Sequence, residues 1–341
     1  MTQMNEVDVR RFEFDFDTTW SAFLVDADLN IYSRYGGRDE NVADSRMSKA
    51  SLLHTMQAVL DVHRQRADLK PEELKASQHP APGERATPED IPLLKNNHEG
   101  CVHCHQVREY AALQAAHDGL FKRRMLFGYP LPENLGIKLE RDHGHRVGRV
   151  FESSPAAAAD LRAGDVIERV NDVPVRSEAD IRWALHRLPD REPLVIAVER
   201  PRAGLPPEQV QVKLQPEGAW RHTELGWRKS LRSVPFPIGF IAYGLGREER
   251  RAAGLPADTL AIKVLSVRGA GLGENVQLRK GDLIVNLAGR TGSRTFEEFK
   301  SDLLRLYEPE NKVQLTVVRA GVKVELSGKF PAWHTTETSV P

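Results

Sequence analysis

Short apolar runs alternate with polar positions near the N-terminus of the chain. Phe23, Leu24 and Val25 form one such run, a cluster of turn-forming Asp and Asn residues follows, and the extended pattern resumes over residues 31–35. Two extended runs on either side of a turn are typical of paired strands. The pattern therefore predicts a strand pair within residues 20–37.

The spacing of the apolar positions changes to that of a helix after Ser48. From there, positions three and four residues apart share one face of an α-helix. The positions on that face are Leu52, Leu53, Met56, Val59, Leu60 and His63. The Ser48 hydroxyl can accept a hydrogen bond from the first turn and cap the helix. We expect a helix from about Ser48, with this stripe buried.

Residues 67–97 show neither the alternation typical of a strand nor the apolar spacing typical of a helix. Prolines lie among charged residues at positions 71, 80, 82, 88 and 92. This composition predicts a linker, or a segment wrapped loosely around a neighbour. A helical pattern returns over residues 106–127, interrupted by Gly119, and the stretch "FGYPLPENLG" ends it.

The C-terminal half of the chain repeats itself. "LRAGDVI" at 161–167 and "LRKGDLI" at 278–284 are identical at five of seven positions. In both copies a glycine-bearing extended segment comes before this heptapeptide, and a helical pattern and a β-rich run come after it. A repeat of this length predicts two domains of the same topology. The second copy has 14 more residues before its heptapeptide, which predicts a loop insertion.

The two copies also share local signals. Ser177 is followed three residues later by Asp180, and Thr295 by Glu298. This spacing fits a capping box, in which hydroxyl and carboxylate satisfy free N–H groups at a helix start. The Gly-Asp pair within each heptapeptide is interpreted as a structural turn, not as a catalytic acid.

At these residues the chain resembles a known family. "SSPAAAADLRAGDVIERVNDVPVRSEADIRWALHRL" resembles the PDZ modules attached to bacterial periplasmic proteases, and residues 278–319 resemble a second, more divergent copy. The resemblance implies two PDZ modules, over 131–218 and 235–331. PDZ modules bind an extended peptide as an added strand beside a helix.

The resemblance also implies which residues meet the peptide. A nest of backbone N–H groups around a glycine would hold the peptide's terminal carboxylate. These groups belong to Leu135, Gly136 and Ile137 in the first copy and to Ile238, Gly239 and Phe240 in the second, where Pro237 has no N–H. The facing helices would contribute Ile181 and Leu185, or Phe299 and Leu303. The alternative is that the modules only pack against each other or against the rest of the chain.

A protease is not predicted. The sequence has no Gly-x-Ser-x-Gly elbow, and no serine stands in a plausible order with a His and an Asp.

The first block has a resemblance of its own. "TTWSAFLVDADLNIYSRYGG" with the helix that follows resembles the second half of a thioredoxin-like domain, although no cysteine precedes Cys101. Either the block is a degenerate remnant held against a partner, or the recorded sequence begins inside a longer natural chain. The second explanation is favoured, because a unit this small buries too little apolar surface by itself.

Both cysteines of the chain lie in "CVHCH" at 101–105. Cys-x-x-Cys-His is the attachment signature of c-type haem. Cys101 and Cys104 would bind the porphyrin and His105 the iron, with Met125, His117 or His98 as second axial ligand. Zinc, held by both thiols and two of His98, His103 and His105, is an alternative. A redox dithiol or disulfide and a pair of unreactive thiols also stay open.

Composition narrows the class of protein. Lys plus Arg and Asp plus Glu are both 48, so the chain lacks the basic excess of a nucleic-acid-binding protein. No apolar run reaches the length of a membrane span, and the N-terminus has no signal-peptide core. If Met1 is the true start, the chain is expected in the cytoplasm. If an upstream signal is missing, as the haem interpretation requires, it is periplasmic or otherwise extracytoplasmic.

The sequence therefore predicts an α+β multidomain chain, with two PDZ-like small β-barrels, each with a capping helix, preceded by a partial thioredoxin-like β-β-α unit and a helical Cys-His segment. The expected parts are a first unit at 1–66, a linker at 67–97, the Cys-His segment at 98–130, the first module at 131–218, a connector at 219–234, the second module at 235–331 and a tail at 332–341. The predicted function is that of a non-catalytic extracytoplasmic adaptor that binds peptide termini or extended segments through its PDZ modules, with peptide or protein C-termini as partners. The alternative is a thiol-disulfide oxidoreductase that uses Cys101 and Cys104.

Overall fold

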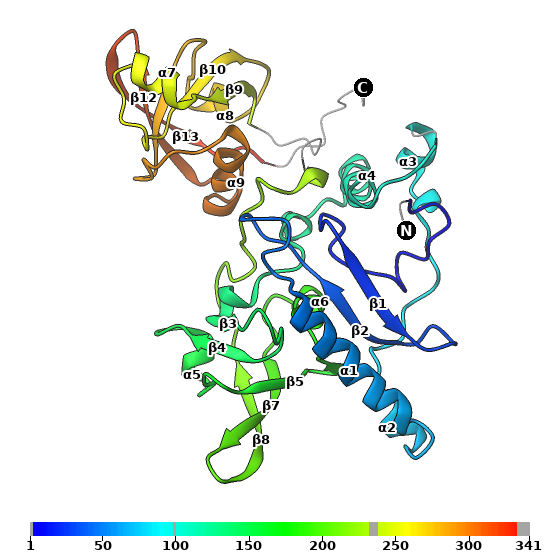
Figure 1. Ribbon diagram of the computed structural model, residues 1–341. Helices are drawn as coiled ribbons and strands as arrows, with labels where there is room; N and C mark the ends of the chain where they lie inside the picture. The colour runs from blue at the N-terminus through cyan, green and yellow to red at the C-terminus, as the bar shows by residue number, and fades with distance from the viewer. Residues whose placement is uncertain (1–2, 98–99, 232–237, 333–341) are drawn as a thin grey trace. The chain divides into compact units, whose positions relative to one another are not determined.

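The computed structural model describes residues 3–97, 100–231 and 238–332. Helices and strands are mixed along the chain, and the residues group into two compact units (Figure 1). The first unit comprises Met1–Gln114 and Lys122–Thr223, and the second comprises Ala115–Phe121 and Glu224–Pro341. Among the described residues, no helix combines the length and the apolar character that crossing a membrane requires.

The first block contains the predicted strand pair and helix. Strands β1 (Ser21–Val25) and β2 (Ile31–Gly36) pair antiparallel, and α1 (Lys49–Gln65) follows. Ser48 caps α1, because its Oγ accepts the backbone N–H of Ser51 at 3.0 Å. The likeness of this block to half of a thioredoxin stays a prediction.

The buried face of α1 includes Val59 but only part of the predicted apolar stripe. The exposed fractions are 53% for Leu53, 42% for Met56 and 42% for Leu60. The buried residues are Ser51, Thr55 and Val59. Tyr35 on β2 lies 2.6 Å from the Ser51 Oγ, and Thr55 donates to the carbonyl of Arg176 at 2.9 Å. Hydrogen bonds to β2 and to the first module thus decide which face turns inward.

The proline-rich segment lies against the first block and contains short helices. These are α2 (Pro71–Ala76), η1 (Pro88–Asp90) and α3 (Pro92–Asn97). The backbone N–H of His79 donates to the carbonyl of Ile31 at 2.7 Å, and that of Val9 donates to Ala86 at 2.8 Å. Of the two interpretations of this segment, a wrap around a neighbour describes its contacts.

The helix expected over residues 106–127 is divided. Helix α4 (Cys104–His117) ends before Gly119, and the 3₁₀ helix η2 (Arg123–Phe127) follows. Gly119 is left-handed, with φ of +68°, and the N–H of Leu120 donates to the Ala115 carbonyl at 2.7 Å. A glycine in this conformation ends a helix, so the prediction of one continuous helix was wrong.

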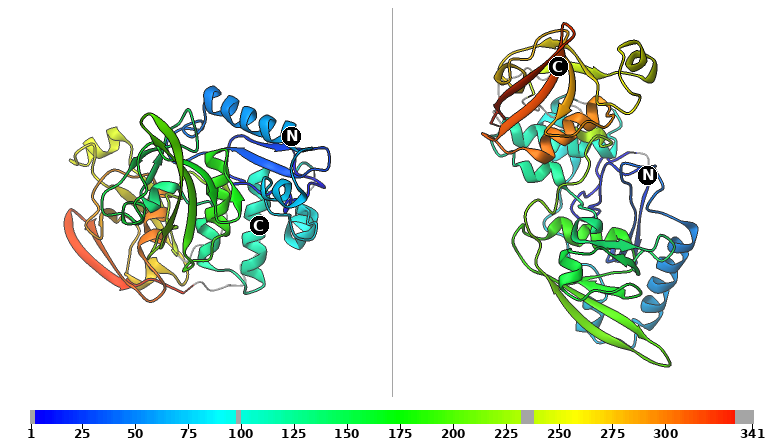
Figure 2. Two further views of the ribbon diagram at one scale, coloured as in Figure 1. Left: turned by 90° about the horizontal axis from the view of Figure 1, so that it is seen from below. Right: turned by 90° about the vertical axis from the view of Figure 1, so that its left-hand side faces the viewer.

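The first module has two small sheets around one core. Its elements are η3 (Pro132–Leu135), β3 (Ile137–Leu139), β4 (Val147–Val150), α5 (Pro155–Ala158), β5 (Val166–Val170), β6 (Val173–Pro174), α6 (Glu178–Arg187), β7 (Leu194–Arg202) and β8 (Leu205–Leu214). Strands β3 and β4 pair, and the second sheet has the order β6-β5-β7-β8, with a long β7–β8 hairpin (Figure 2). Leu135, Ile167 and Leu185 are among the residues that close the core.

The second module has a similar order of elements, with helix α7 added and, among the described residues, no strand in the place of β6. After η4 (Lys229–Leu231) it comprises β9 (Phe240–Gly244), α7 (Arg247–Ala252), β10 (Ile262–Val267), α8 (Leu272–Asn275), β11 (Leu283–Leu287), α9 (Phe296–Leu306), β12 (Lys312–Arg319) and β13 (Val322–Lys329). Its strands form one sheet of order β13-β12-β11-β10-β9. Helix α7 lies between β9 and β10, within the stretch where the sequence has extra residues.

The Gly-Asp turn is built in the same way in both modules. Asp165 accepts the backbone N–H of Arg162 at 2.9 Å, and Arg200 on β7 donates two hydrogen bonds to its carboxylate. Asp282 in the second module likewise accepts from Arg279 and receives two hydrogen bonds from Arg319 on β12. A two-pronged arginine–carboxylate pair is a strong structural link, which fits the interpretation of these acids as turn residues.

Candidate functional site

The edge of the second module's sheet is the first part of the candidate site. Within the described residues, β9 is the end strand and pairs with β10 alone. The side chains of Ile241 and Tyr243 on β9 are 41% and 38% exposed. A strand of this kind has backbone N–H and C=O groups on its outer side that can pair with a further strand.

Helix α9 lies beside that strand. The ring of Phe296, in the first turn of α9, is 5.9 Å from the ring of Phe240, the first residue of β9. Thr295 caps the helix by accepting the Glu298 N–H at 3.2 Å, and Glu298 accepts the Thr295 N–H at 2.7 Å. The predicted capping box is thus present, and it fixes the start of α9 next to the end strand.

The predicted residues of the second module differ in exposure. Ile238 and Gly239 are partly exposed, while Phe240, Phe299 and Leu303 are buried. The carbonyl of Ile238 accepts the N–H of Gly273 at 2.8 Å, and that of Gly239 accepts the N–H of Arg268 at 2.9 Å. Pro237 lies outside the described residues.

Helix α6 of the first module is in a different environment. Ser177 and Thr295 are the N-caps of α6 and α9, so Glu178 corresponds to Phe296 and Arg182 to Lys300. Phe296 and Lys300 are partly exposed, whereas Glu178 and Arg182 are buried. The same positions of the two helices therefore differ in what covers them.

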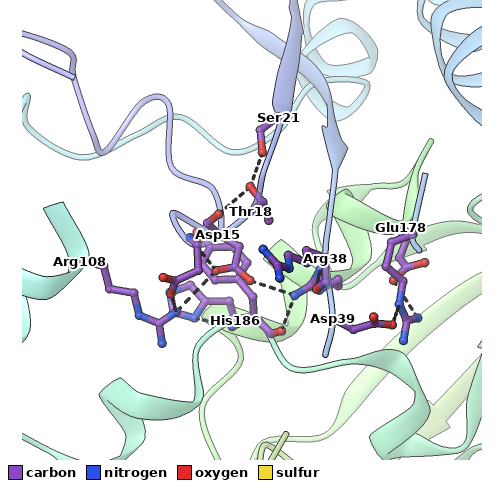
Figure 3. Close-up of polar contacts among 12 residues, drawn as sticks. Asp15, Thr18, Ser21, Arg38, Asp39, Arg108, Glu178 and His186 are labelled. Carbon is purple, nitrogen blue, oxygen red and sulfur yellow. Dashed lines mark hydrogen bonds and ion pairs between the residues drawn. The ribbon is translucent and has the colours of Figure 1, made fainter. Parts of the chain in front are cut away.

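Arg46 of the first block bridges the two walls of the first module's predicted groove. Its guanidinium lies 2.7 Å from Glu133, in the segment before β3, and 3.1 Å from Glu178 at the start of α6. Asp39 accepts a third hydrogen bond from Arg46 at 2.7 Å (Figure 3). Burial lowers the pKa of Arg46, but the carboxylates of Glu178 and Glu133 outweigh it and raise the pKa above the ordinary value. Arg46 is therefore a fixed cation between the groove walls.

The rest of α6 is bonded to the first block as well. Arg182 donates to Asp15 at 2.9 Å and to the Arg38 carbonyl at 3.2 Å (Figure 3). The Trp183 indole N–H donates to Glu13 at 2.7 Å. These bonds attach the loop before β1 and the segment after β2 to the middle of α6.

Of the α6 residues that contact the first block, Asp180 has the most hydrogen-bond partners. Its carboxylate accepts the Ser33 hydroxyl and the Arg34 backbone N–H, each at 2.7 Å, and the Arg176 N–H at 2.9 Å. The His79 ring lies 3.1 Å from it. Only half of the predicted capping box forms here: Ser177 caps the Asp180 N–H, while the Asp180 carboxylate turns to β2.

The predicted peptide-binding residues of the first module lie in its core. Leu135, Ile137, Ile181 and Leu185 are each at most 1% exposed. Gly136 has φ of +88°, and a Cβ there would lie 2.0 Å from the Ser154 hydroxyl, so only glycine fits. These residues shape the segment before β3.

The Cys-His segment borders an apolar cavity. Cys101 is exposed and precedes α4, whereas Cys104 begins the helix and packs against a cluster that includes Met4, Val102 and Val107. Burial raises the pKa of the Cys104 thiol. Cys104 also lines a cavity of about 390 Å³, whose other walls are mostly apolar and include Phe14.

The candidate iron and zinc ligands are scattered among several elements. The rings of His103 and His105 stack at 6.0 Å, Met125 lies on η2 and His117 ends α4. His98 lies outside the described residues. Within the described part of the chain, no group of three His, Cys, Asp or Glu side chains could hold a metal ion. The haem and zinc interpretations stay predictions.

Sequence reasoning missed Arg46 and the role of Asp180. The capping-box spacing pointed to Asp180 but assigned its carboxylate to the helix N-terminus. No local signal marks Arg46, which lies 87 residues from Glu133 and 132 from Glu178.

Comparison with known proteins supports the module assignment. Residues 134–214 match the family model of the PDZ domain, so the first module is a PDZ domain. The chain is 29% identical over 202 residues to a probable periplasmic serine endoprotease DegP-like of Ectopseudomonas mendocina (strain ymp). That match covers 56% of this chain and 38% of the relative, so the chain spans well under half of the relative's length.

Two solved structures are also similar in part. The HtrA-type protease AlgW with a decapeptide matches with a TM-score of 0.24 and 18% identity, covering 40% of this chain and 41% of that chain. A serine-to-alanine variant of AlgW with a decapeptide matches with a TM-score of 0.25 and 19% identity, covering 40% of each chain.

Proposed function

We propose that the chain is a non-catalytic extracytoplasmic adaptor that captures peptide or protein C-termini, and that its second module does the binding. One observation carries the choice of module. Strand β9 is an end strand beside α9, with exposed side chains, whereas α6 of the first module is bonded to the first block. An added strand needs a sheet edge with a helix beside it.

The extracytoplasmic location rests on similarity. The DegP-like relative is described as periplasmic. The first PDZ domain would then stabilise the first block, and the second module would bind the guest.

Peptide binding is tested with the full chain and a library of C-terminal peptides. We expect enrichment of a C-terminal motif, measured by fluorescence anisotropy with an enriched peptide. Phe296→Glu places a charge beside β9 and should weaken binding at least about tenfold, because it buries a carboxylate at the contact. Val322→Glu is the matched control, since Val322 is an exposed residue on β13.

Two outcomes would count against this assignment. Absence of any enriched C-terminus removes the adaptor proposal. Equal weakening by Phe296→Glu and Val322→Glu, or binding that survives Phe296→Glu, would move the site away from β9.

We also propose c-type haem at the Cys-His segment. Cys101 and Cys104 would hold the porphyrin and His105 the iron, and the group would supply one-electron chemistry. The apolar cavity beside Cys104 fits a flat apolar ligand. The rival dithiol enzyme has less support, because a raised pKa leaves the Cys104 thiol in its less reactive form.

Spectroscopy separates the haem proposal from its rivals. Protein made with haem-maturation machinery should show a Soret band that survives acid-acetone extraction, and Cys101→Ser with Cys104→Ser should abolish it. A protein that lacks the band and has two titratable thiols would support the dithiol instead.

A further inference from the structure

A second cavity, of about 620 Å³, lies within the first unit, and six of its eighteen lining residues are cationic. Its walls come from the loop before β1, the start of β2, helix α2 and the segment after it, strand β5 and helix α6. The cationic residues in its lining are Arg10, Arg11, Arg34, Lys75, Arg169 and Arg187. Only two carboxylates, Glu72 and Asp172, line it. The volume falls in the usual range of small-molecule sites.

Most of these cations lack an acidic partner. Among the described residues, the side chains of Arg10, Arg34, Lys75 and Arg169 have no carboxylate oxygen within the 4.0 Å range of an ion pair, whereas Arg11 and Arg187 each reach one at 3.9 Å. Arg169 uses its guanidinium to bond the carbonyls of Ala76 and Asp172, each at 2.7 Å. Six cations converge on the cavity and only two carboxylates line it, so the cations repel one another, and an anion bound among them would relieve that repulsion.

Among the cationic residues that line the cavity, Arg34 is buried and its side chain is held in place. It is 4% exposed, and its guanidinium carbon lies 3.8 Å from the centroid of the Trp183 ring and 5.6 Å from that of Phe23. Its Nε donates to the Glu13 carbonyl at 2.9 Å. Burial lowers the pKa of Arg34 to about 10, which still leaves it protonated at neutral pH. The side chain is thus charged and held in one position before any ligand arrives.

The neighbouring carboxylates balance the charge of Arg34 only in part: Asp180 and Glu13 oppose the lowering of its pKa by burial, but burial outweighs them. His79 contacts its guanidinium, and burial lowers the pKa of that imidazole, which favours the neutral form. Asp180 bonds the backbone N–H of Arg34 and has its oxygens occupied by Ser33 and Arg176 as well.

We propose that this cavity binds a small anionic ligand that carries two or more oxyanion groups, either carboxylates or phosphates. Arginine presents several N–H donors in a plane and pairs with both kinds of oxyanion. The cationic residues surround a cavity of limited volume, so one ligand with several charges matches them better than a single ion. The site is separate from β9 and does not depend on peptide binding.

The test uses the full chain and two probes, pyrophosphate and citrate, at constant ionic strength. We expect saturable binding of at least one probe in isothermal titration calorimetry, with an upward shift of the thermal midpoint of the first unit. The double variant Arg10→Gln, Lys75→Gln should weaken probe binding about tenfold or more, because each substitution removes a hydrogen bond from a charged group to the anion. Arg10 and Lys75 are exposed, so these changes leave the fold intact.

The control carries the same loss of charge elsewhere. Lys312→Gln with Lys323→Gln changes two exposed lysines of the second module and should leave binding unchanged. Arg34→Lys keeps the charge but loses the planar fork, and should weaken binding while circular dichroism stays that of the wild type. Binding of pyrophosphate alone would identify phosphates as the ligand class, and binding of both probes would support oxyanions in general.

The proposal is overturned if neither probe binds saturably, or if the control variant loses as much affinity as Arg10→Gln, Lys75→Gln. Either result leaves peptide capture at β9 untouched, so the two proposals fail separately.

Discussion

The two modules have a similar order of elements, the same Gly-Asp turn and a hydroxyl cap at the same helix position, yet their groove helices differ. In the first module, Glu178 and Arg182 on α6 are buried under Arg46, Asp15 and Arg38 of the first block. In the second, the corresponding Phe296 and Lys300 on α9 are partly exposed beside an end strand. A module of one architecture can therefore be a structural support in one place and a binding site in another.

The difference lies in the residue types on the helix face. Glu178 and Arg182 are charged and need partners when buried, which the first block supplies. Phe296 is apolar and needs none, so it can face a guest peptide. The buried charges of Glu178 and Arg182 explain why α6 is covered by the chain itself, whereas Phe296 and Lys300 at the same positions of α9 stay partly exposed.

The largest expected contrast comes from one position in each helix. Asp180→Ala removes the acceptor for Ser33, Arg34 and Arg176, and should lower the free energy of unfolding of the first unit by about 3 to 5 kcal/mol. Glu298→Ala, the matched change in the second module, loses only a capping carboxylate and should cost about 1 kcal/mol. Urea denaturation of the full chain measures both, and equal losses would contradict the comparison.

A smaller effect should be the same in both modules. Arg200→Ala and Arg319→Ala each leave a buried aspartate without its arginine, Asp165 or Asp282. We expect each to destabilise its own module by about 2 kcal/mol, the size of a lost charged hydrogen bond. Denaturation midpoints that shift for only one variant would show that the turns are not equivalent.

The first unit and the second module should also differ in their response to pH. Burial lowers the pKa of His79 below its ordinary value of 6.5, and the pKa values of His145 and His186 are lowered too. Below about pH 6.5 these histidines become protonated in the unfolded chain but stay neutral in the folded first unit. Their contribution to the stability of the first unit is therefore complete above about pH 6.5 and is lost as the pH falls. The slope is at most about 1.4 kcal/mol per pH unit for each histidine.

The second module supplies the reference for this measurement, because residues 235–331 contain no histidine. The free energy of unfolding of the second module should change little between about pH 7.5 and 5.5. His79→Gln should reduce the slope of the first unit. A slope that stays unchanged in that variant would place the proton uptake elsewhere.

The smallest expected effect on the free energy of unfolding comes from exposed residues of α1, in the first block. Leu53→Ser and Met56→Ser alter exposed residues of α1 and should change the free energy of unfolding by less than about 0.5 kcal/mol. A loss of several times that value in urea denaturation would mean that the apolar stripe is buried after all, as the sequence pattern predicts.

Local signals were sufficient for much of the fold. The hairpin at β1 and β2, the Ser48 cap, the Gly-Asp turns and the division of the C-terminal half depend on residues a few positions apart, and the sequence predicts them. The helix over 106–127 was predicted too long, because its pattern continues past Gly119 but its backbone does not. Of the site, the sequence predicted the strand and helix beside each other in the second module, but not the cover of the first.

The sequence by itself determined that this chain contains a repeated module with capped helices and structural turns, since each of these depends on neighbouring residues. Only the tertiary structure decided which helix face stays accessible, which face of α1 is buried, and that six cationic side chains line one cavity. Ser33 and Asp180 are 147 residues apart in the sequence, and their contact depends on how separate segments pack. The local pattern of apolar and polar residues carries no information about such a contact.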